Sequence, residues 1–247
     1  MIGKLLLVVG KSTMGKSHSL KHLRDPDKVI YINSESGKRL PFKHGFKEFI
    51  ITDPIPELLG EKGLLDKISK HPDKAKTVVI DSITFLMDMV ETKYVKTAKD
   101  TRQAWGIYSD FFINLVNQEI PKLIKAGINV IVIAHAADMI NEKTLSMEVV
   151  VPVKGSIRTK GVEAFFNDIV ACKRLPITEL ENYESDLLHI TDKERQKKLK
   201  YVIQTQVTAD TVCERLRGPE DMWEEKETFI DSNVQTVLDR MDQFYGE

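Results

Sequence analysis

Short apolar runs alternate with amphipathic stretches along most of the chain. Runs that are apolar on both faces predict buried strands: Lys4–Val9, Val29–Ile32, Thr77–Ile80 and Asn129–Ala134. Weaker strand patterns lie at Phe49–Ile51, Asp168–Cys172 and Tyr201–Val207. Apolar spacing typical of helices lies between them, at Ser17–Arg24, Leu58–Lys70, Ser82–Tyr94 and Arg102–Lys125. This alternation predicts an α/β fold, with a mostly parallel central sheet and helices on both faces.

The pattern changes after the fourth buried strand. Leu145–Val153 has a looser alternation, which we interpret as an arm of a hairpin, and Glu179–Lys200 is a polar insertion. Asp231–Tyr245 has the spacing of an amphipathic helix. No stretch is rich enough in Gly, Ser or Pro to act as a linker, so we expect one domain over residues 1–247, with its core over about 1–175.

Composition narrows the functional classes. The 247 residues carry a formal net charge of −1, so a uniformly basic nucleic-acid binder is excluded and any such contact needs a local basic patch. No apolar run approaches the ~20 residues that span a bilayer, and we expect no membrane partner. The two cysteines, Cys172 and Cys213, form no C-x-x-C pair, which favours free thiols and a cytoplasmic location.

The turn after the first strand carries the clearest chemistry, because it fits G-x-x-x-x-G-K-[ST] between a strand and a helix. Glycines let successive backbone N–H groups face one anion, and the start of the helix adds a positive dipole. Lys16 is expected to reach the β- and γ-phosphates of ATP, and the Ser17 hydroxyl to bind Mg²⁺. The candidate nucleotide-binding residues are Gly10, Lys11, Ser12, Thr13, Met14, Gly15, Lys16, Ser17 and His18.

Polar side chains follow three of the buried strands. Asp81 ends Thr77–Ile80 and is the candidate second Mg²⁺ ligand, although a helix N-cap is an alternative role. Glu35 follows the second strand and is the candidate base or orienter of the water that attacks the γ-phosphate. His135 ends the fourth strand and is the candidate sensor of that phosphate. We therefore assign the catalytic candidates as Lys16, Glu35 and His135.

In this order, the phosphate loop, the N-S-E strand end, V-V-I-D-S and V-I-V-I-A-H resemble the RecA-type ATPase core. The H-A-A-D at His135–Asp138 and the later R-G-P near Arg217 are most similar to small phage-encoded, core-only members linked to single-strand annealing and recombination. The resemblance implies an ATPase, with ATP and Mg²⁺ as cofactors, that binds single-stranded DNA as a homo-oligomer, either ring or filament. It also implies the cytoplasm of a bacterial host as location, and a single-strand DNA-binding protein as a further candidate partner.

The resemblance also implies roles for two later segments. The stretch that follows the fourth strand, 138–161, corresponds to a DNA-contacting loop, and its end carries Lys154, Arg158 and Lys160 without an acid among them. Arg215 and Arg217 resemble residues that act in trans on the nucleotide of a neighbouring subunit.

Other functions share parts of this pattern. A helicase-like motor with a RecA-type core would use the same strand ends. A P-loop small-molecule kinase would need an arginine-rich lid, which the sequence does not clearly contain. A partitioning-type switch ATPase is favoured only by Lys11, since a lysine follows the first glycine in such loops.

Overall fold

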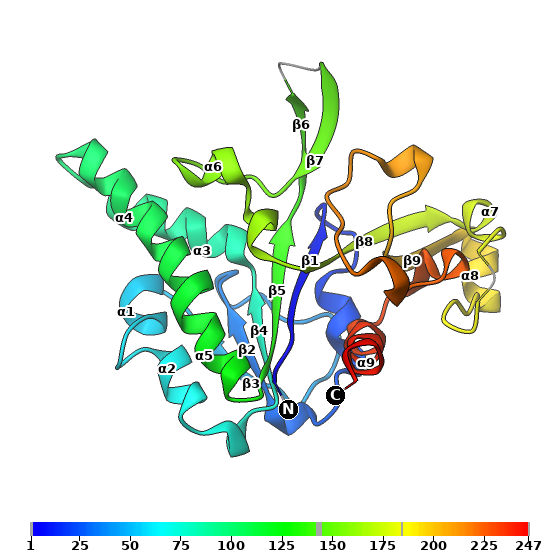
Figure 1. The fold of residues 1–247 in the computed structure, drawn as a ribbon, viewed down its shortest axis with the longest axis horizontal. Helices are drawn as coiled ribbons and strands as arrows, with labels where there is room; N and C mark the ends of the chain where they lie inside the picture. The colour runs from blue at the N-terminus through cyan, green and yellow to red at the C-terminus, as the bar shows by residue number, and fades with distance from the viewer. Residues whose placement is uncertain (1, 142–144, 184, 247) are drawn as a thin grey trace.

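The computed structural model describes residues 2–141, 145–183 and 185–246, and its centre is an eight-stranded sheet (Figure 1). The strand order across this sheet is β10-β9-β8-β1-β5-β4-β2-β3. The strands are β1 (Leu5–Gly10), β2 (Val29–Asn33), β3 (Lys47–Ile50), β4 (Thr77–Asp81), β5 (Asn129–His135), β8 (Asp168–Pro176), β9 (Leu199–Gln204) and β10 (Phe229–Asp231).

The strands from β8 to β3 run parallel, and β9 and β10 are added antiparallel at one side. The mostly parallel sheet predicted from the sequence is therefore confirmed. Every residue of β2 and β4 is buried, as expected for strands that are covered on both faces. The parallel arrangement also brings the carboxyl ends of β1, β2, β4 and β5 to one edge of the sheet.

Helices cover both faces of the sheet (Figure 1). Side chains of one face, such as Leu7 and Ile80, pack with α1 (Pro54–Leu58), α2 (Leu64–Ser69), α3 (Ile83–Val90), α4 (Thr101–Asn114) and α5 (Ile120–Lys125). Side chains of the other face, such as Leu6 and Val8, pack with the 3₁₀ helix η1 (Ser17–His22) and with α9 (Val234–Tyr245). The remaining α-helices are short: α6 (Ile157–Lys160), α7 (Ile177–Leu180) and α8 (Asp192–Lys197).

The single helix predicted over Leu58–Lys70 is wrong, because the structure breaks it into α1 and α2. Gly60 has φ +77°, a left-handed conformation that ends α1. A Cβ atom on Gly63 would lie 2.4 Å from the carbonyl oxygen of Leu58, so this close turn requires glycine. The prediction failed because the apolar residues keep a helical spacing on both sides of this turn.

The predicted hairpin arm is confirmed. β6 (Ala137–Asn141) and β7 (Ser146–Val150) form a separate antiparallel pair, which projects from the carboxyl edge of the large sheet (Figure 1). Part of the predicted DNA loop over 138–161, residues 142–144, lies outside the described residues.

The polar insertion over 179–200 is less exposed than its composition predicts. Leu180 is buried against Val202 and Phe229, because α7 leads from β8 into a small apolar cluster of its own. One residue of this insertion, 184, lies outside the described residues. The strand β10 was missed by the sequence pattern because it is only three residues long.

Across the described ranges, no helix has both the length and the apolar composition that crossing a membrane requires.

Candidate active site

The phosphate loop connects β1 to η1 through a tight turn. A Cβ atom on Gly10 would lie 2.8 Å from the carbonyl oxygen of Cys172 on β8, so the packing of the two strands requires glycine there. Gly15 has φ +89° and Thr13 has φ +66°, which is the curled backbone that turns N–H groups toward one centre. The predicted loop is therefore formed, although the helix after it is a 3₁₀ helix.

Lys16 is buried at the centre of this loop. Its ammonium donates to the carbonyl oxygens of Gly10 at 2.8 Å and Lys11 at 2.9 Å, and it lies 3.4 Å from Nδ1 of His135. Burial lowers the pKa of Lys16, although the carboxylates of Asp81 and Glu35 act in the opposite direction. An anionic phosphate bound in the loop would stabilise the charged ammonium of Lys16, as water does for an exposed lysine.

Asp81 lies beside Ser17, as the sequence predicts for two ligands of one ion. The Ser17 hydroxyl donates to Oδ2 of Asp81 at 2.8 Å, and the Tyr31 hydroxyl donates to the same oxygen at 2.8 Å. The alternative N-cap role belongs to Ser82, whose hydroxyl accepts from the backbone N–H of Phe85 at the start of α3. Asp81 therefore does not cap α3, and it stays the candidate Mg²⁺ ligand.

The surroundings of Asp81 fit a magnesium ion. Its Oδ1 is buried and has no hydrogen-bond partner among the described residues, and burial raises the pKa of this carboxyl despite the two hydroxyl donors. A hydroxyl and a carboxylate are hard oxygen ligands of the kind Mg²⁺ prefers. No cluster of three or more His, Cys, Asp or Glu side chains suited to a metal occurs in the described residues, so the ion would need phosphate oxygens and water as its other ligands.

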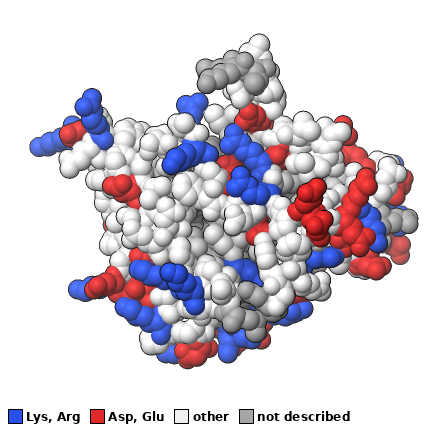
Figure 2. All heavy atoms as spheres, viewed as in Figure 1, with Lys and Arg blue, Asp and Glu red and all other residues white. Residues whose placement is uncertain are grey.

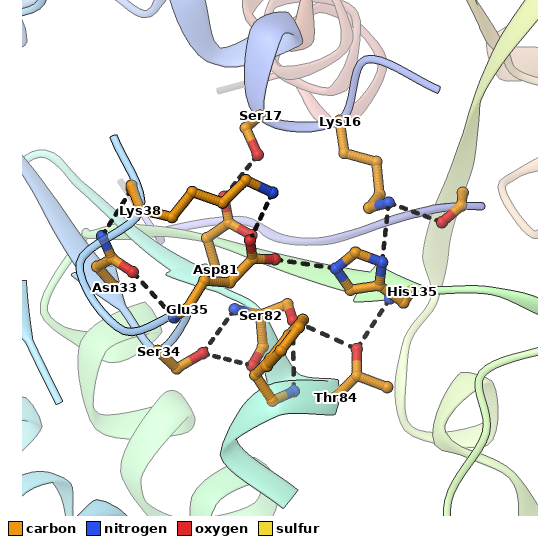
Figure 3. A network of polar contacts seen from close by, with 12 residues as sticks. Lys16, Ser17, Asn33, Ser34, Glu35, Lys38, Asp81, Ser82, Thr84 and His135 are labelled. Carbon is orange, nitrogen blue, oxygen red and sulfur yellow. Dashed lines mark hydrogen bonds and ion pairs between the residues drawn. The ribbon is translucent and has the colours of Figure 1, made fainter. Parts of the chain in front are cut away.

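Glu35 and His135 contact each other across the carboxyl edge of the sheet (Figure 3). Nε2 of His135 lies 2.9 Å from Oε1 of Glu35, and the other carboxylate oxygen accepts from Lys38 at 3.0 Å. An ammonium only donates, so Nδ1 of His135 accepts from Lys16 and Nε2–H donates to Glu35. These contacts form one chain of hydrogen bonds from Lys38 to Lys16.

The charge of Glu35 is set by opposing effects. Burial raises the pKa of its carboxyl, but the hydrogen bonds from His135 and Lys38 outweigh burial and hold the pKa below its usual value. Glu35 is therefore a carboxylate at neutral pH, which is the form that accepts a proton or orients a water.

Several residues that support these groups were not predicted. The Thr84 hydroxyl accepts from the backbone N–H of His135 at 2.9 Å, and the Ser34 hydroxyl accepts from Ser82 N–H at 2.8 Å while donating to the Ser82 carbonyl. These bonds tie the ends of β2, β4 and β5 together (Figure 3). Ser34 and Ser82 lie within the N-S-E and V-V-I-D-S strings of the sequence, but they were assigned no role, and no motif marks Thr84.

The phosphate loop opens into a cavity of about 390 Å³. Its lining includes residues of the loop together with Glu35, His135, Leu40, Pro41 and Tyr201. The ring of Tyr201 on β9 lies over Gly15, since a Cβ atom there would be 3.0 Å from its Cδ1. His18, a candidate nucleotide-binding residue, lines the cavity, and so does Tyr201, which comes from a strand that no local motif connects to the loop.

The candidate DNA-contacting residues lie outside this cavity. Arg158 and Lys160 are exposed on α6, but the ammonium of Lys154 is held by Glu91 at 2.6 Å. Lys and Arg side chains gather around α6 and the base of the hairpin, with acidic side chains among them (Figure 2). The exposed positive charge of this segment therefore comes from Arg158 and Lys160, and Lys154 is paired with a carboxylate.

The two arginines predicted to act in trans are bonded within their own chain. Arg215 pairs with Glu148 of β7 at 2.6 Å, and the guanidinium of Arg217 donates to the carbonyl oxygen of Phe166 at 3.2 Å. Lys11 likewise pairs with Asp138 of β6.

The parallel sheet, the phosphate loop and the polar strand ends define an α/β RecA-like P-loop ATPase. A family model described as an AAA domain matches residues 3–173, and the chain belongs to that family. Curated proteins include one relative, the SPbeta prophage-derived uncharacterized protein YorG of Bacillus subtilis (strain 168), which is 27% identical over 148 residues. That match covers 55% of this chain and 42% of the relative, so the chain spans less than half of the relative's length.

Among solved structures, the crystal structure of the RadB recombinase is similar at 21% identity and a TM-score of 0.42. The match covers 71% of this chain and 76% of that chain.

Proposed function

We propose that this protein is a magnesium-dependent ATPase that binds single-stranded DNA as an oligomer and promotes annealing or strand exchange in recombination of the phage type. One observation carries the ATPase part: Lys16, Ser17, Glu35 and His135, from three separate segments, line a single cavity, and Asp81 of a fourth segment accepts from the Ser17 hydroxyl. The prophage origin in the name of the relative supports the phage setting.

Each of these residues has a separate role in the proposed hydrolysis. Lys16 exchanges the two carbonyl oxygens that it now contacts for phosphate oxygens. Ser17 and Asp81 would hold Mg²⁺, which would neutralise charge on the phosphates. Glu35 orients the attacking water and accepts its proton, since it is an ionised carboxylate within reach of the cavity.

His135 connects this chemistry to the hairpin. It contacts both Lys16 and Glu35, and β6 begins two residues after it. Loss of the γ-phosphate changes the partners of Lys16, so the imidazole is placed to pass that change to the segment that follows.

DNA contact is assigned to the hairpin and α6. Arg158 and Lys160 are exposed and have no acidic partner in the described residues, so their charges are available for phosphates of a single strand. Lys154 is the weaker candidate because Glu91 competes for it. In the oligomer, Arg215 would exchange Glu148 for the nucleotide of a neighbouring subunit, with Arg217 as the second trans-acting candidate. A single-strand DNA-binding protein is the further expected partner.

Binding of a fluorescent single strand tests the DNA part of this proposal. Anisotropy is measured with a non-hydrolysable ATP analogue, with ADP and without nucleotide, and sedimentation records the assembly state. We expect the tightest binding and the largest assemblies with the analogue, and weaker binding with a shallower salt dependence for Arg158→Ala and Lys160→Ala. Lys197→Ala, at an exposed lysine on α8, is the matched control. Equal binding by all variants would contradict the assignment.

A further inference from the structure

The turn that follows β2 places two opposite charges side by side. Ser36 has φ +54° and Gly37 has φ +74°, and the backbone N–H of Lys38 donates to the carbonyl oxygen of Glu35 at 3.1 Å. A bond of this kind, with positive φ at both central residues, defines a tight β-turn. The side chains of Glu35 and Lys38, which flank the turn, therefore lie next to each other.

Asn33 holds this turn at both ends. Its side chain is buried at the end of β2, where Oδ1 accepts from the backbone N–H of Glu35 at 2.9 Å and Nδ2 donates to the carbonyl oxygen of Lys38 at 3.1 Å (Figure 3). The backbone positions of the two charged residues are therefore fixed by the amide of Asn33, and not by the contact between their side chains.

The contact with Lys38 opposes the role of Glu35 as a base. Oε2 of Glu35 accepts from Nζ of Lys38 at 3.0 Å, and Oε1 lies 2.9 Å from Nε2 of His135. Burial raises the pKa of the Glu35 carboxyl, whereas the contacts with His135 and Lys38 hold that pKa below its ordinary value. A carboxylate paired in this way accepts a proton from water less readily than one that has lost its ammonium partner.

The ammonium of Lys38 is able to change its partner. The Lys38 side chain is 73% exposed, and within the described residues its ammonium has no other partner than Glu35. An ion pair with such an exposed member contributes little to stability. The long and flexible lysine stem can therefore carry the charge to a stronger anion nearby.

The cavity is built to receive such an anion. Lys38 lines it together with Lys16 and Arg39, and Glu35 is the one carboxylate that the described residues contribute to the lining. Contacts run in series from Lys16 to His135, from His135 to Glu35 and from Glu35 to Lys38. A terminal phosphate that accepts from Lys16, with its attacking water beside Glu35, would also lie near the ammonium of Lys38.

We propose that Lys38 contacts the γ-phosphate of ATP, and that its ammonium moves to this phosphate from Glu35 when ATP binds. The move leaves Oε2 of Glu35 to accept from the attacking water. ADP lacks the γ-phosphate, so Lys38 stays on Glu35 when ADP is bound. This inference rests on the proposed ATPase function, and it adds how the site distinguishes ATP from ADP.

Nucleotide binding and hydrolysis by two variants test this assignment. Lys38→Met keeps the length of the side chain without its charge, and Lys38→Arg keeps the charge. Displacement of a fluorescent nucleotide gives Kd for a non-hydrolysable ATP analogue and for ADP, and single-turnover rates are measured at saturating ATP. Lys67→Met, at an exposed lysine of α2 outside the cavity, is the matched control and should behave as wild type.

We expect Lys38→Met to raise Kd for the ATP analogue about tenfold and to change Kd for ADP by less than about twofold, because only the γ-phosphate receives the ammonium. The single-turnover rate should fall about tenfold or more, since charge that develops on the phosphate loses a partner. Lys38→Arg should retain the preference for the ATP analogue over ADP, with a rate within about fivefold of wild type.

Two results would overturn the proposal. One is a Kd that changes equally for both nucleotides, or for neither, because a residue that only shapes the turn does not distinguish them. The other is a faster single turnover in Lys38→Met with an unchanged ratio of the two Kd values, since Lys38 would then act on Glu35 alone. The comparison of Kd values requires no hydrolysis, so it tests Lys38 even if the wild type fails to hydrolyse ATP, which is the result that would contradict the ATPase proposal.

Discussion

Lys11 and Asp138 form an ion pair, with 2.7 Å between Nζ and Oδ2, that joins the phosphate loop to the first strand of the projecting hairpin. A backbone bond lies beside it, because Ala136 N–H donates to the carbonyl oxygen of Gly10 at 3.0 Å. The same Gly10 carbonyl accepts from Lys16. Lys16, the phosphate loop and the base of the hairpin are therefore in direct contact.

Because both partners of this ion pair are about half exposed, at 46% and 45%, its contribution to stability is small. A double-mutant cycle of Lys11→Ala and Asp138→Ala should give a coupling energy of about 0.2–1 kcal/mol in urea unfolding. Hydrogen exchange of the β6 and β7 amides should become faster in either variant, while the ATPase rate without DNA stays within about threefold. A complete loss of hydrolysis in Lys11→Ala would instead favour a direct role of Lys11 at the nucleotide.

Asp81→Asn should separate stability from chemistry. The variant keeps a polar oxygen for the Ser17 and Tyr31 hydroxyls but removes a buried charge with an unpartnered oxygen, so the free energy of unfolding should not fall. Hydrolysis should fall by about 10²-fold or more, and the Mg²⁺ concentration for half-maximal rate should rise. A magnesium titration of both proteins checks this, with Ser17→Ala as the second ligand variant. An unchanged titration would remove Asp81 from the metal site.

Glu35→Gln should lower the rate of hydrolysis while nucleotide binding is retained. The amide can still accept from His135 but cannot accept a proton, and we expect kcat to fall by about 10²- to 10⁴-fold. The Kd for a fluorescent ATP analogue should change by less than about twofold. Glu61→Gln, an exposed residue outside the cavity, should behave as wild type in both measurements. If Kd rises in step with the loss of rate, Glu35 acts in binding.

Asp168 makes stability depend on pH. Burial raises the pKa of this carboxyl to about 6, although a hydrogen bond from Tyr245 acts in the opposite direction. In the unfolded chain, the pKa of this carboxyl is about 3.9. The stabilisation from holding the proton is therefore complete below about pH 4 and is lost as the pH rises through about 6.

Asp168→Asn should consequently unfold at higher denaturant than wild type at pH 7.5, by about 2 kcal/mol in free energy, and the difference should vanish near pH 4. Guanidinium unfolding across this range measures it, with Asp73→Asn at an exposed position as control. A difference that is constant with pH would assign the effect to packing.

The sequence identified the parts of the site that depend on local motifs. A phosphate loop and polar residues that end apolar strands are short-range features, and parallel strands bring their ends to one edge, so Lys16, Ser17, Asp81, Glu35 and His135 were predicted together. Tyr31, Thr84 and Tyr201 were missed because their roles depend on register between strands and on β9 approaching the loop from far along the chain.

The same distinction applies to the fold. The buried parallel strands were recognised because each is apolar on both faces, whereas helical spacing alone did not reveal the turn between Leu58 and Leu64. The partners of Lys154, Arg215 and Arg217 are contacts between distant segments, which no pattern along the chain encodes.

The central claim, an ATPase stimulated by single-stranded DNA, is tested most directly by steady-state ATP hydrolysis with Mg²⁺. Rates are compared without DNA, with single-stranded DNA and with duplex DNA, and Lys16→Ala gives the blank. We predict hydrolysis that requires Lys16 and rises selectively with single strands. A rate that is equal in all three conditions, or that Lys16→Ala retains, would contradict the account.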